Sequence, residues 1–372
     1  LAVATALALR GAQVTVLEQA DAIREVGAGL QISPNGAVVL RALGLGPALE
    51  AASIRARRVE LRDGISGGQV LGLDLAGLRP GKGYHLVHRA DLIGLLLDGA
   101  RAAGVNLRLL QRIETVDLSG QHPRLVTALG AEFCPALLIG ADGLHSRVRA
   151  ALNGVAAPFF THQVAWRALI PAEPGAAPVA EVHMGPGRHL VSYPLRGGTL
   201  RNIVAVEERS RWAEEGWNLR DDPMDLRLAF KDFSPRVRGW LEAVDEVWLW
   251  GLFRHPVARH WQGRGAALLG DAAHPTLPFL AQGANMALED AWVLAASLAG
   301  HDTVTAGLAA YEAARVPRCT RIVEAANGNA RAYHLKSPLR DLAHLGLRLG
   351  GRIAPGLALR RFDWIYEHDV TA

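Results

Sequence analysis

The chain has 372 residues, half of them hydrophobic, and a formal net charge of +4, which suits one elaborated domain or two domains around a large core. The small excess of basic over acidic residues is spread along the chain and does not indicate a protein that binds nucleic acid. No apolar run approaches the roughly 20 residues that span a bilayer, and nothing resembles a signal peptide, so we expect a cytoplasmic protein without a membrane partner.

The first elements have the order of half a nucleotide-binding unit. Residues 1–9 are apolar nearly all round and end at Arg10-Gly11, which predicts a buried helix. Residues 12–17 predict a short buried strand that is closed by Glu18. Helix, strand and terminal acid are typical of the second half of a Rossmann βαβ unit, where the acid hydrogen-bonds an adenosine ribose. A solvated turn residue is the alternative interpretation of Glu18.

Residues 25–43 combine a glycine-containing loop with a following helix. Gly27 and Gly29 would allow a ligand to approach the backbone closely. The alternative is an ordinary loop in which Asn35 caps the helix, and both interpretations can hold. A later helix is expected to begin near Asp91 and to end at Gly104.

Between residues 155 and 263 the composition changes to short runs with strand character. Turns such as Gly185-Pro186-Gly187 separate these runs, so we predict an inserted antiparallel sheet. Seven of the nine tryptophans lie between Trp166 and Trp261. They indicate either the core of that sheet or an aromatic-lined substrate pocket, with equal weight. The expected strands cover residues 163–170, 179–184, 189–194, 199–207 and 247–253.

The stretch from residue 266 to residue 300 has the layout of a ligand site. A buried strand ends at Gly270-Asp271, a loop with two prolines follows, and a helix is predicted from Ala284 to Ala299. Asp271 can accept hydrogen bonds from ribityl or ribose hydroxyls. The free amide groups around Gly283 suit a group that becomes negative, such as the N1/O2 edge of a reduced flavin.

The sequence from residue 301 to residue 372 predicts helices and contains no motif that we can assign. It either covers the preceding domain or forms the contact of a homodimer. The two cysteines, Cys134 and Cys319, are far apart and have no metal-binding spacing, so we predict reduced thiols and no metal site.

Residues 270–274, GDAAH, together with Pro278, Gly283 and Asn285, resemble the flavin motif of single-component FAD-dependent aromatic hydroxylases, most closely the salicylate-hydroxylase-like branch. Residues 140–149, GADGLHSRVR, resemble a second motif of that family, in which an Asp-Gly turn touches FAD and the pyridine nucleotide.

The resemblance implies a set of residues that contact FAD. Two of them have structural alternatives, since Asp142 could form a turn and an ion pair with Arg147, and Arg89 could be a surface arginine. In the family a GxGxxG loop precedes the first helix, and it is absent before Leu1. We therefore expect that the chain is truncated at its N-terminus and binds FAD poorly as written. The implied residues are Glu18, Ala28, Gly29, Gln31, Arg89, Asp142, Gly143, Gly270, Asp271, Pro278, Gly283, Ala284 and Asn285.

The expected fold is α/β, with a Rossmann-like FAD-binding domain of the glutathione-reductase type that carries the inserted sheet. The FAD domain would comprise residues 1–154, without the first strand and glycine loop, and residues 264–300. Residues 155–263 would form the β-rich substrate domain, and residues 301–372 the C-terminal helices.

The resemblance implies a monooxygenase in which NADH or NADPH reduces FAD. O2 then forms a flavin C4a-hydroperoxide that hydroxylates a small aromatic substrate. The salicylate branch favours NADH. The alternatives are another flavin enzyme on this fold, such as an epoxidase or an oxidative decarboxylase, and a non-catalytic binding protein that has lost FAD.

We expect the side chains of Pro278 and Gln282 nearest to the reacting face of the flavin. In some relatives that act on hydroxybenzoates or hydroxypyridines, a His followed one turn later by a Tyr activates the phenol. The corresponding stretch here is expected at residues 206–212, where Glu208 and Trp212 would take those places. Glu208 is then either a base with a raised pKa or a member of a solvated charge cluster.

Overall fold

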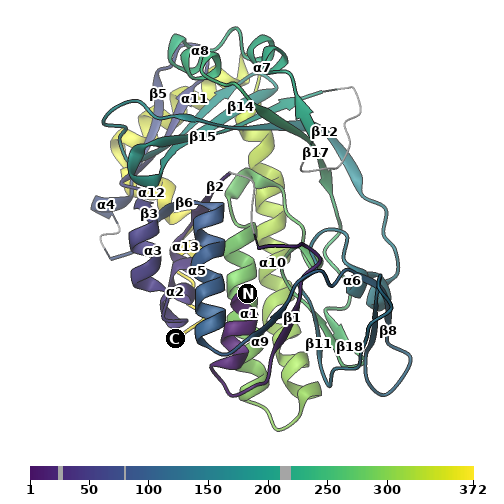
Figure 1. Ribbon diagram of the computed structural model, residues 1–372. Helices are drawn as coiled ribbons and strands as arrows, with labels where there is room; N and C mark the ends of the chain where they lie inside the picture. The colour runs from purple at the N-terminus through teal and green to yellow at the C-terminus, as the bar shows by residue number, and fades with distance from the viewer. Residues whose placement is uncertain (24–27, 79–80, 210–218) are drawn as a thin grey trace.

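The computed structural model describes residues 1–23, 28–78, 81–209 and 219–372. Its elements form two parts (Figure 1). A large sheet crosses the top of the molecule in that view, with helices α7 (Pro223–Ala229) and α8 (Pro235–Glu242) on its outer side. Beneath it lie upright helices, and the long helix α10 (Val304–Tyr333) runs from the lower part up to the sheet.

The lower part is assembled from segments far apart in the sequence. Strand β1 (Thr15–Leu17) pairs in parallel with β7 (Asn106–Arg108), as expected for a nucleotide-binding half. Strand β11 (Leu138–Gly140) pairs in parallel with β19 (Ala266–Leu268), and residues 141–265 lie between them in the chain. Helices α1 (Ala2–Ala8) and α9 (Gly283–Ala299) pack in the same core. Segments on either side of residues 141–265 therefore come together in the lower part of the molecule.

The large sheet has eight strands in the order β16-β17-β12-β15-β14-β13-β4-β5. Every strand expected between residues 163 and 253 is present and begins and ends within a few residues of the expected bounds. The eight strands are β4 (Arg58–Asp63), β5 (Gln69–Asp74), β12 (Phe159–Pro171), β13 (Val179–Gly185), β14 (Arg188–Leu195), β15 (Leu200–Glu208), β16 (Leu219–Asp221) and β17 (Val247–Arg254).

Two strands of this sheet, β4 and β5, come from the first segment of the chain. Strand β4 pairs in parallel with β13, from Arg58 opposite Val179 to Asp63 opposite Met184. The sheet is therefore mixed, and not purely antiparallel as expected, and its strands do not all come from residues 155–263. The alternation of apolar residues shows which face of a strand is buried, but it does not identify a partner from a distant segment.

The tryptophans belong to the core of the sheet. Trp166 and Trp240 are buried in the apolar cluster between the sheet and helices α7 and α8. The indole Nε1 of Trp166 donates a hydrogen bond of 2.6 Å to Asp221 Oδ2. Of the two interpretations of the tryptophan-rich segment, the sheet core therefore holds for these two residues.

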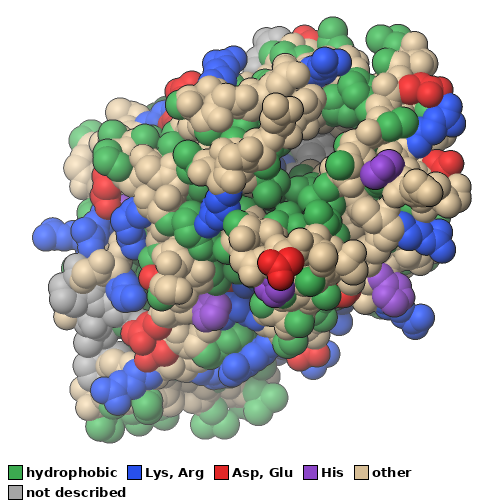
Figure 2. Space-filling view, turned by 90° about the horizontal axis from the view of Figure 1, so that it is seen from below, with side chains coloured by type: hydrophobic (Ala, Val, Ile, Leu, Met, Phe, Trp, Pro, Cys, Tyr) green, Lys and Arg blue, Asp and Glu red, His purple; other side chains and the backbone are tan. Residues whose placement is uncertain are grey.

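The C-terminal region is helical, as expected. Helix α11 (Leu339–Ile353) packs on strand β5 and leaves a stripe of leucines exposed, and helix α12 (Pro355–Arg360) follows it. None of the helices in the described ranges is long and apolar enough to cross a membrane. Seen from below, the molecule is hollowed near the centre of this face, where hydrophobic side chains gather (Figure 2).

The other elements connect these parts. The helices are α2 (Pro34–Ala42), α3 (Gly46–Ala52), α4 (Leu75–Leu78), α5 (Arg89–Ala102), α6 (Arg147–Asn153) and α13 (Asp363–Tyr366). The strands are β2 (Gly29–Ile32), β3 (Ser53–Arg55), β6 (His85–His88), β8 (Ile113–Asp117), β9 (Arg124–Thr127), β10 (Glu132–Phe133) and β18 (Gln262–Gly263). The 3₁₀ turns are η1 (Arg196–Gly198), η2 (Gly270–Ala272) and η3 (Pro278–Leu280).

Candidate active site

A cavity of about 1080 Å³ lies between the inner face of the large sheet and the helices beneath it. The start of α9, the end of α10 and helices α11 and α12 contribute to its walls. On strand β14, His189, Val191 and Tyr193 all line it, because alternate residues of a strand face the same side. None of the described tryptophans lines this cavity.

One end of the cavity carries the residues expected around a flavin. Gly29, Arg89, Asp271, Pro278 and Gly283 all line it. A side chain at Gly29 would place a Cβ 2.5 Å from the ring of Tyr193, so the backbone can approach Tyr193 this closely only because this residue is glycine. The five expected residues come from three separate segments of the chain, and the fold brings them to one place.

Helix α9 begins at this end of the cavity. Gly283 and Ala284, in its first turn, line the cavity, and the capping residue Gln282 makes no side-chain hydrogen bond to the helix start. Amide groups at the start of a 17-residue helix attract negative charge. The residues present therefore fit a ligand with hydroxyl groups and an edge that becomes anionic, which is the chemistry of FAD.

Asp271 is exposed to the cavity and enclosed by protein on its other sides. Burial raises the pKa of its carboxyl group, against the effect of the cations His274 and Arg89. A carboxylate in this position can accept hydrogen bonds from ribityl hydroxyls.

We expect Asp271→Ala to weaken FAD binding by about ten- to a hundredfold, since a charge-assisted hydrogen bond contributes about 1.5–3 kcal/mol. Asp271→Asn should weaken FAD binding less, because its amide oxygen can still accept a hydrogen bond. FAD titration and apo-protein melting, measured on the same two variants, test this. If the carboxylate only braces the turn, both variants will melt lower and bind FAD like the wild type.

Two other residues that the resemblance implies for FAD lie at strand ends, and their polar groups have partners within the chain. Glu18 follows β1, and its Oε1 accepts a hydrogen bond of 2.9 Å from the amide of Ala20. Asp142 follows β11 and accepts from the hydroxyl of Ser146 at 2.5 Å and from the amide of Arg147 at 2.7 Å. Asp142 therefore braces the start of α6, and neighbouring Gly143 has a positive φ of 73°.

Gln282 does not line the cavity, although its side chain was expected near the reacting face. It is buried, its Nε2 donates to Ser33 Oγ at 3.0 Å, and its Oε1 accepts from Asn35 Nδ2 at 3.1 Å. Asn285 is buried beside it and donates to the carbonyl oxygen of Gln31 at 3.0 Å. These amides hold strand β2 against α9 and so position the cavity-lining residue Gln31. Ala28 is buried next to this strand, and its carbonyl oxygen accepts from the amide of Arg89.

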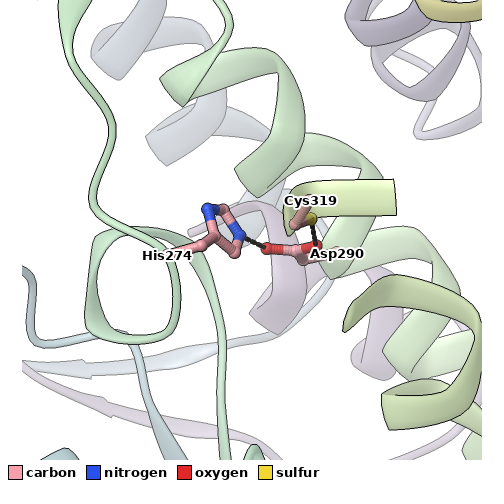
Figure 3. Close-up of side chains that lie close together, drawn as sticks. All are labelled: His274, Asp290 and Cys319. Carbon is pink, nitrogen blue, oxygen red and sulfur yellow. Dashed lines mark hydrogen bonds and ion pairs between the residues drawn. The ribbon is translucent and has the colours of Figure 1, made fainter. Parts of the chain in front are cut away.

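A buried ionic cluster lies behind the Gly270-Asp271 turn (Figure 3). His274 Nε2 lies 2.5 Å from Asp290 Oδ2, and the same oxygen accepts from the amide of Gly270 at 3.0 Å. Burial lowers the pKa of His274, but Asp290 outweighs this effect and the pKa lies well above its usual value. The carboxylate thus holds both ends of the turn that presents Asp271 to the cavity.

His274, Asp290 and Cys319 lie close enough together to ligate a metal ion. However, Arg315 donates to Asp290 Oδ1 at 2.7 Å and to Glu289 Oε2 at 2.6 Å, so cationic groups already occupy these carboxylates. Burial and the charge of Asp290 also raise the pKa of the Cys319 thiol. A neutral thiol, a charged imidazolium and a guanidinium at one site suit an ion-paired cluster and not a metal centre.

Sequence reasoning missed a chain of polar groups that leads out of the cavity. His189 Nδ1 lies 2.7 Å from His334 Nε2, and His334 Nδ1 lies 2.9 Å from Glu208 Oε1. His189 and His334 are buried, whereas the side chain of Glu208 is 47% exposed. Glu208 therefore does not line the cavity, and it reaches the cavity only through the two histidines.

The resemblance placed Glu208 and Trp212 at the positions of the family's His and Tyr, but a His and a Tyr of this chain also lie close together on strand β14. His189 and Tyr193 are four residues apart and both face the cavity, and Trp212 lies outside the described residues. The sequence His-Leu-Val-Ser-Tyr of residues 189–193 lies outside residues 206–212, the stretch in which those two positions were expected. Tyr193 is fully enclosed, and burial raises the pKa of its hydroxyl group.

The chain is similar to proteins of known activity over nearly its whole length. Residues 1–326 match the family model described as FAD binding domain. The chain is 34% identical to 3-amino-4-hydroxybenzoate 2-monooxygenase PtmB3 of Streptomyces platensis, an alignment that covers 100% of this chain and 94% of the relative. It is 33% identical to 3-hydroxybenzoate 6-hydroxylase of Klebsiella oxytoca, with 92% and 88% covered.

The fold is also that of a solved flavoprotein. The crystal structure of Klebsiella pneumoniae HpxO complexed with FAD and uric acid superimposes with a TM-score of 0.84 at 26% identity, covering 96% of this chain and 92% of that one. Sequence and fold agree with the expectation drawn from the GDAAH motif. The chain belongs to the FAD binding domain family and, within it, to the single-component FAD-dependent aromatic hydroxylases.

Proposed function

We propose that this chain hydroxylates a small aromatic substrate that carries a ring hydroxyl group, with His189 as the base that takes the hydroxyl proton. The observation that carries this proposal is the buried path from His189 through His334 to exposed Glu208. Both relatives compared above are named for substrates whose ring bears a hydroxyl group. Bound FAD, reduced by NADH or NADPH, would supply the activated oxygen.

The hydrogen bonds determine which nitrogen of His189 is the base. An ionised Glu208 only accepts, so His334 Nδ1 carries the proton that faces it. His334 Nε2 is then an acceptor, and it receives the Nδ1 proton of His189. His189 Nε2 is therefore left as a lone-pair acceptor for a group in the cavity.

The electrostatics support a neutral base. Burial and neighbouring His334 hold the pKa of His189 well below its usual value, so the imidazole is uncharged at neutral pH. Burial also lowers the pKa of His334, although Glu208 opposes this effect. When His189 Nε2 takes the phenol proton, its Nδ1 proton can pass to His334, and the Nδ1 proton of His334 can pass to Glu208 and solvent. No charge then stays on a buried histidine.

The phenolate that results donates electron density to its ring, which favours attack by an electrophilic oxygen. The cavity walls of this chain are largely apolar, and they keep water away from the reacting groups. Pro278 lies in the wall at the flavin end and would restrict the position of the ring. A homodimer and a cytoplasmic location stay predictions from the sequence.

We expect Glu208→Gln to lower kcat by about tenfold while KM changes little, because the amide can accept a hydrogen bond but cannot take the proton. Glu207→Gln is the matched control, since Glu207 precedes it on β15 and faces the other side of the sheet. Stopped-flow measurement of substrate hydroxylation tests this. A Glu208→Ala variant should regain rate with added formate, and a variant as fast as the wild type at all pH values would contradict the path.

A further inference from the structure

The cavity continues past His189 into a region with apolar walls. We name this region the apolar lobe, and define it by Leu61, Leu71, Val182, Met184, Gly346 and Leu347, all of which line the cavity. The first four residues belong to the large sheet and the last two to helix α11. It lies away from Asp271 and the start of α9, which form the flavin end.

The sheet side of the lobe is a single row of side chains. Val191 pairs with Val182, Val182 with Leu61, and Leu61 with Leu71, across four neighbouring strands. Residues in register on a sheet point to the same face, so these four present one continuous apolar surface. Because Val191 is two residues from His189 on β14, the row begins beside the proposed base.

Helix α11 covers this row from the other side. A Cβ at Gly351 would lie 2.6 Å from Leu71 Cδ1, so the helix backbone packs directly on strand β5. His344, on the same helix, lies in the wall, but its Nδ1 is 3.2 Å from Asp63 Oδ2. The imidazole of His344 is therefore paired with Asp63. Methyl groups form the main surface of the lobe.

We propose that the apolar lobe binds an apolar substituent on the phenolic ring of the substrate, such as an alkyl chain of several carbons. This inference rests on the proposed function, because it takes the ring to lie beside His189. The volume of about 1080 Å³, which includes the flavin end, is slightly above the roughly 300–1,000 Å³ of pockets that enclose drug-sized ligands. If only the flavin ring and one benzene ring were bound, water would have to fill the lobe, and apolar walls bind water poorly.

The lobe offers a position for a direct test. A Cβ at Gly346 would meet no atom within 4 Å, and Gly346 lines the cavity. Gly346 is exposed, so Gly346→Leu adds an apolar side chain to the wall of the lobe without displacing backbone. Gly239, which is exposed on α8 on the outer side of the sheet, also has open space around its Cβ, so Gly239→Leu is the matched control.

The test uses the FAD-loaded protein without NAD(P)H and measures dissociation constants from changes in the flavin absorption spectrum. The probes are phenol, 3-propylphenol, 3-hexylphenol and their 4-substituted isomers. For one isomer series, we expect wild-type affinity to rise by about fourfold for each of the first buried methylene groups. Gly346→Leu should remove most of that gain and leave phenol binding within about twofold, and Gly239→Leu should retain the gain.

Affinity that does not rise with chain length in either series would overturn the proposal. Equal weakening of phenol and hexylphenol in Gly346→Leu would also overturn it, since the side chain would then disturb the ring site. Because the readout is binding, it is independent of hydroxylation. Chain-length dependence without any hydroxylated product would contradict the proposed function and leave the apolar lobe supported.

Discussion

His189→Ala should lower kcat for hydroxylation by about a hundred- to ten-thousandfold, the contribution of a positioned general base. The variant loses both the proton acceptor beside the substrate and the link to His334. His189→Gln should be nearly as slow, because an amide can hydrogen-bond to His334 but cannot take a proton. Hydroxylated product and H2O2 should be quantified together, since a slow substrate step lets reduced flavin react with O2 without hydroxylation.

The pH profile gives this prediction a second readout. A base acts in its neutral form, and the pKa of His189 is lowered, so wild-type kcat should be flat at neutral pH and fall only as the pH drops below about 6.5, the ordinary histidine value. In His189→Ala that acidic limb should disappear. His122→Ala removes an exposed histidine and serves as control. A substrate turnover in His189→Ala that matches the control would remove this residue from the mechanism.

Asp290→Ala should destabilise the folded protein by about 3–5 kcal/mol, because it leaves a buried imidazolium without its carboxylate and a buried guanidinium with Glu289 as its remaining carboxylate partner. Arg315 and His274 both bond to Asp290, and all three side chains are almost completely buried. The amide of Gly270 also loses its acceptor, so FAD affinity should fall as well. Chemical denaturation of the FAD-free protein measures the stability change without the contribution of the ligand.

Cys319→Ala is the contrasting variant for this cluster. The Cys319 sulfur lies 3.8 Å from Asp290 Oδ1. Because the thiol is neutral, it takes no part in the ion pairs of the cluster. Its removal should cost no more than about 1–2 kcal/mol. If the three residues of Figure 3 instead held a metal ion, Cys319→Ala would be as damaging as Asp290→Ala, and metal analysis of purified protein would detect the ion.

Local patterns were sufficient to predict most elements of the fold. The strand at residues 189–194 and the helix from Ala284 to Ala299 could be predicted because alternation and helical periodicity act over a few residues. The place of β4 and β5 in the large sheet could not be predicted in this way. Their parallel contact with β13 joins Arg58 to Val179, and nothing within either segment specifies the other.

The same limit applies to the candidate site. Motifs of contiguous residues placed Asp271 and Arg89 at the cavity, since each motif has its own local structure. The path from His189 depends on His334, which is 145 residues further along the chain, and no spacing rule predicts that contact. The buried pair of Asp290 and Arg315 was overlooked because a charged residue on a helix is usually solvated.

The pairing of β11 with β19 has a consequence for biosynthesis. During translation β11 emerges long before its partner, because residues 141–265 must be made first. Contacts between distant segments form slowly, and an unpaired strand edge in a partly folded chain promotes aggregation. The yield of folded enzyme in a cell should therefore depend on how quickly the inserted sheet folds. A substitution in that sheet can lower the yield without touching either the cofactor or the substrate.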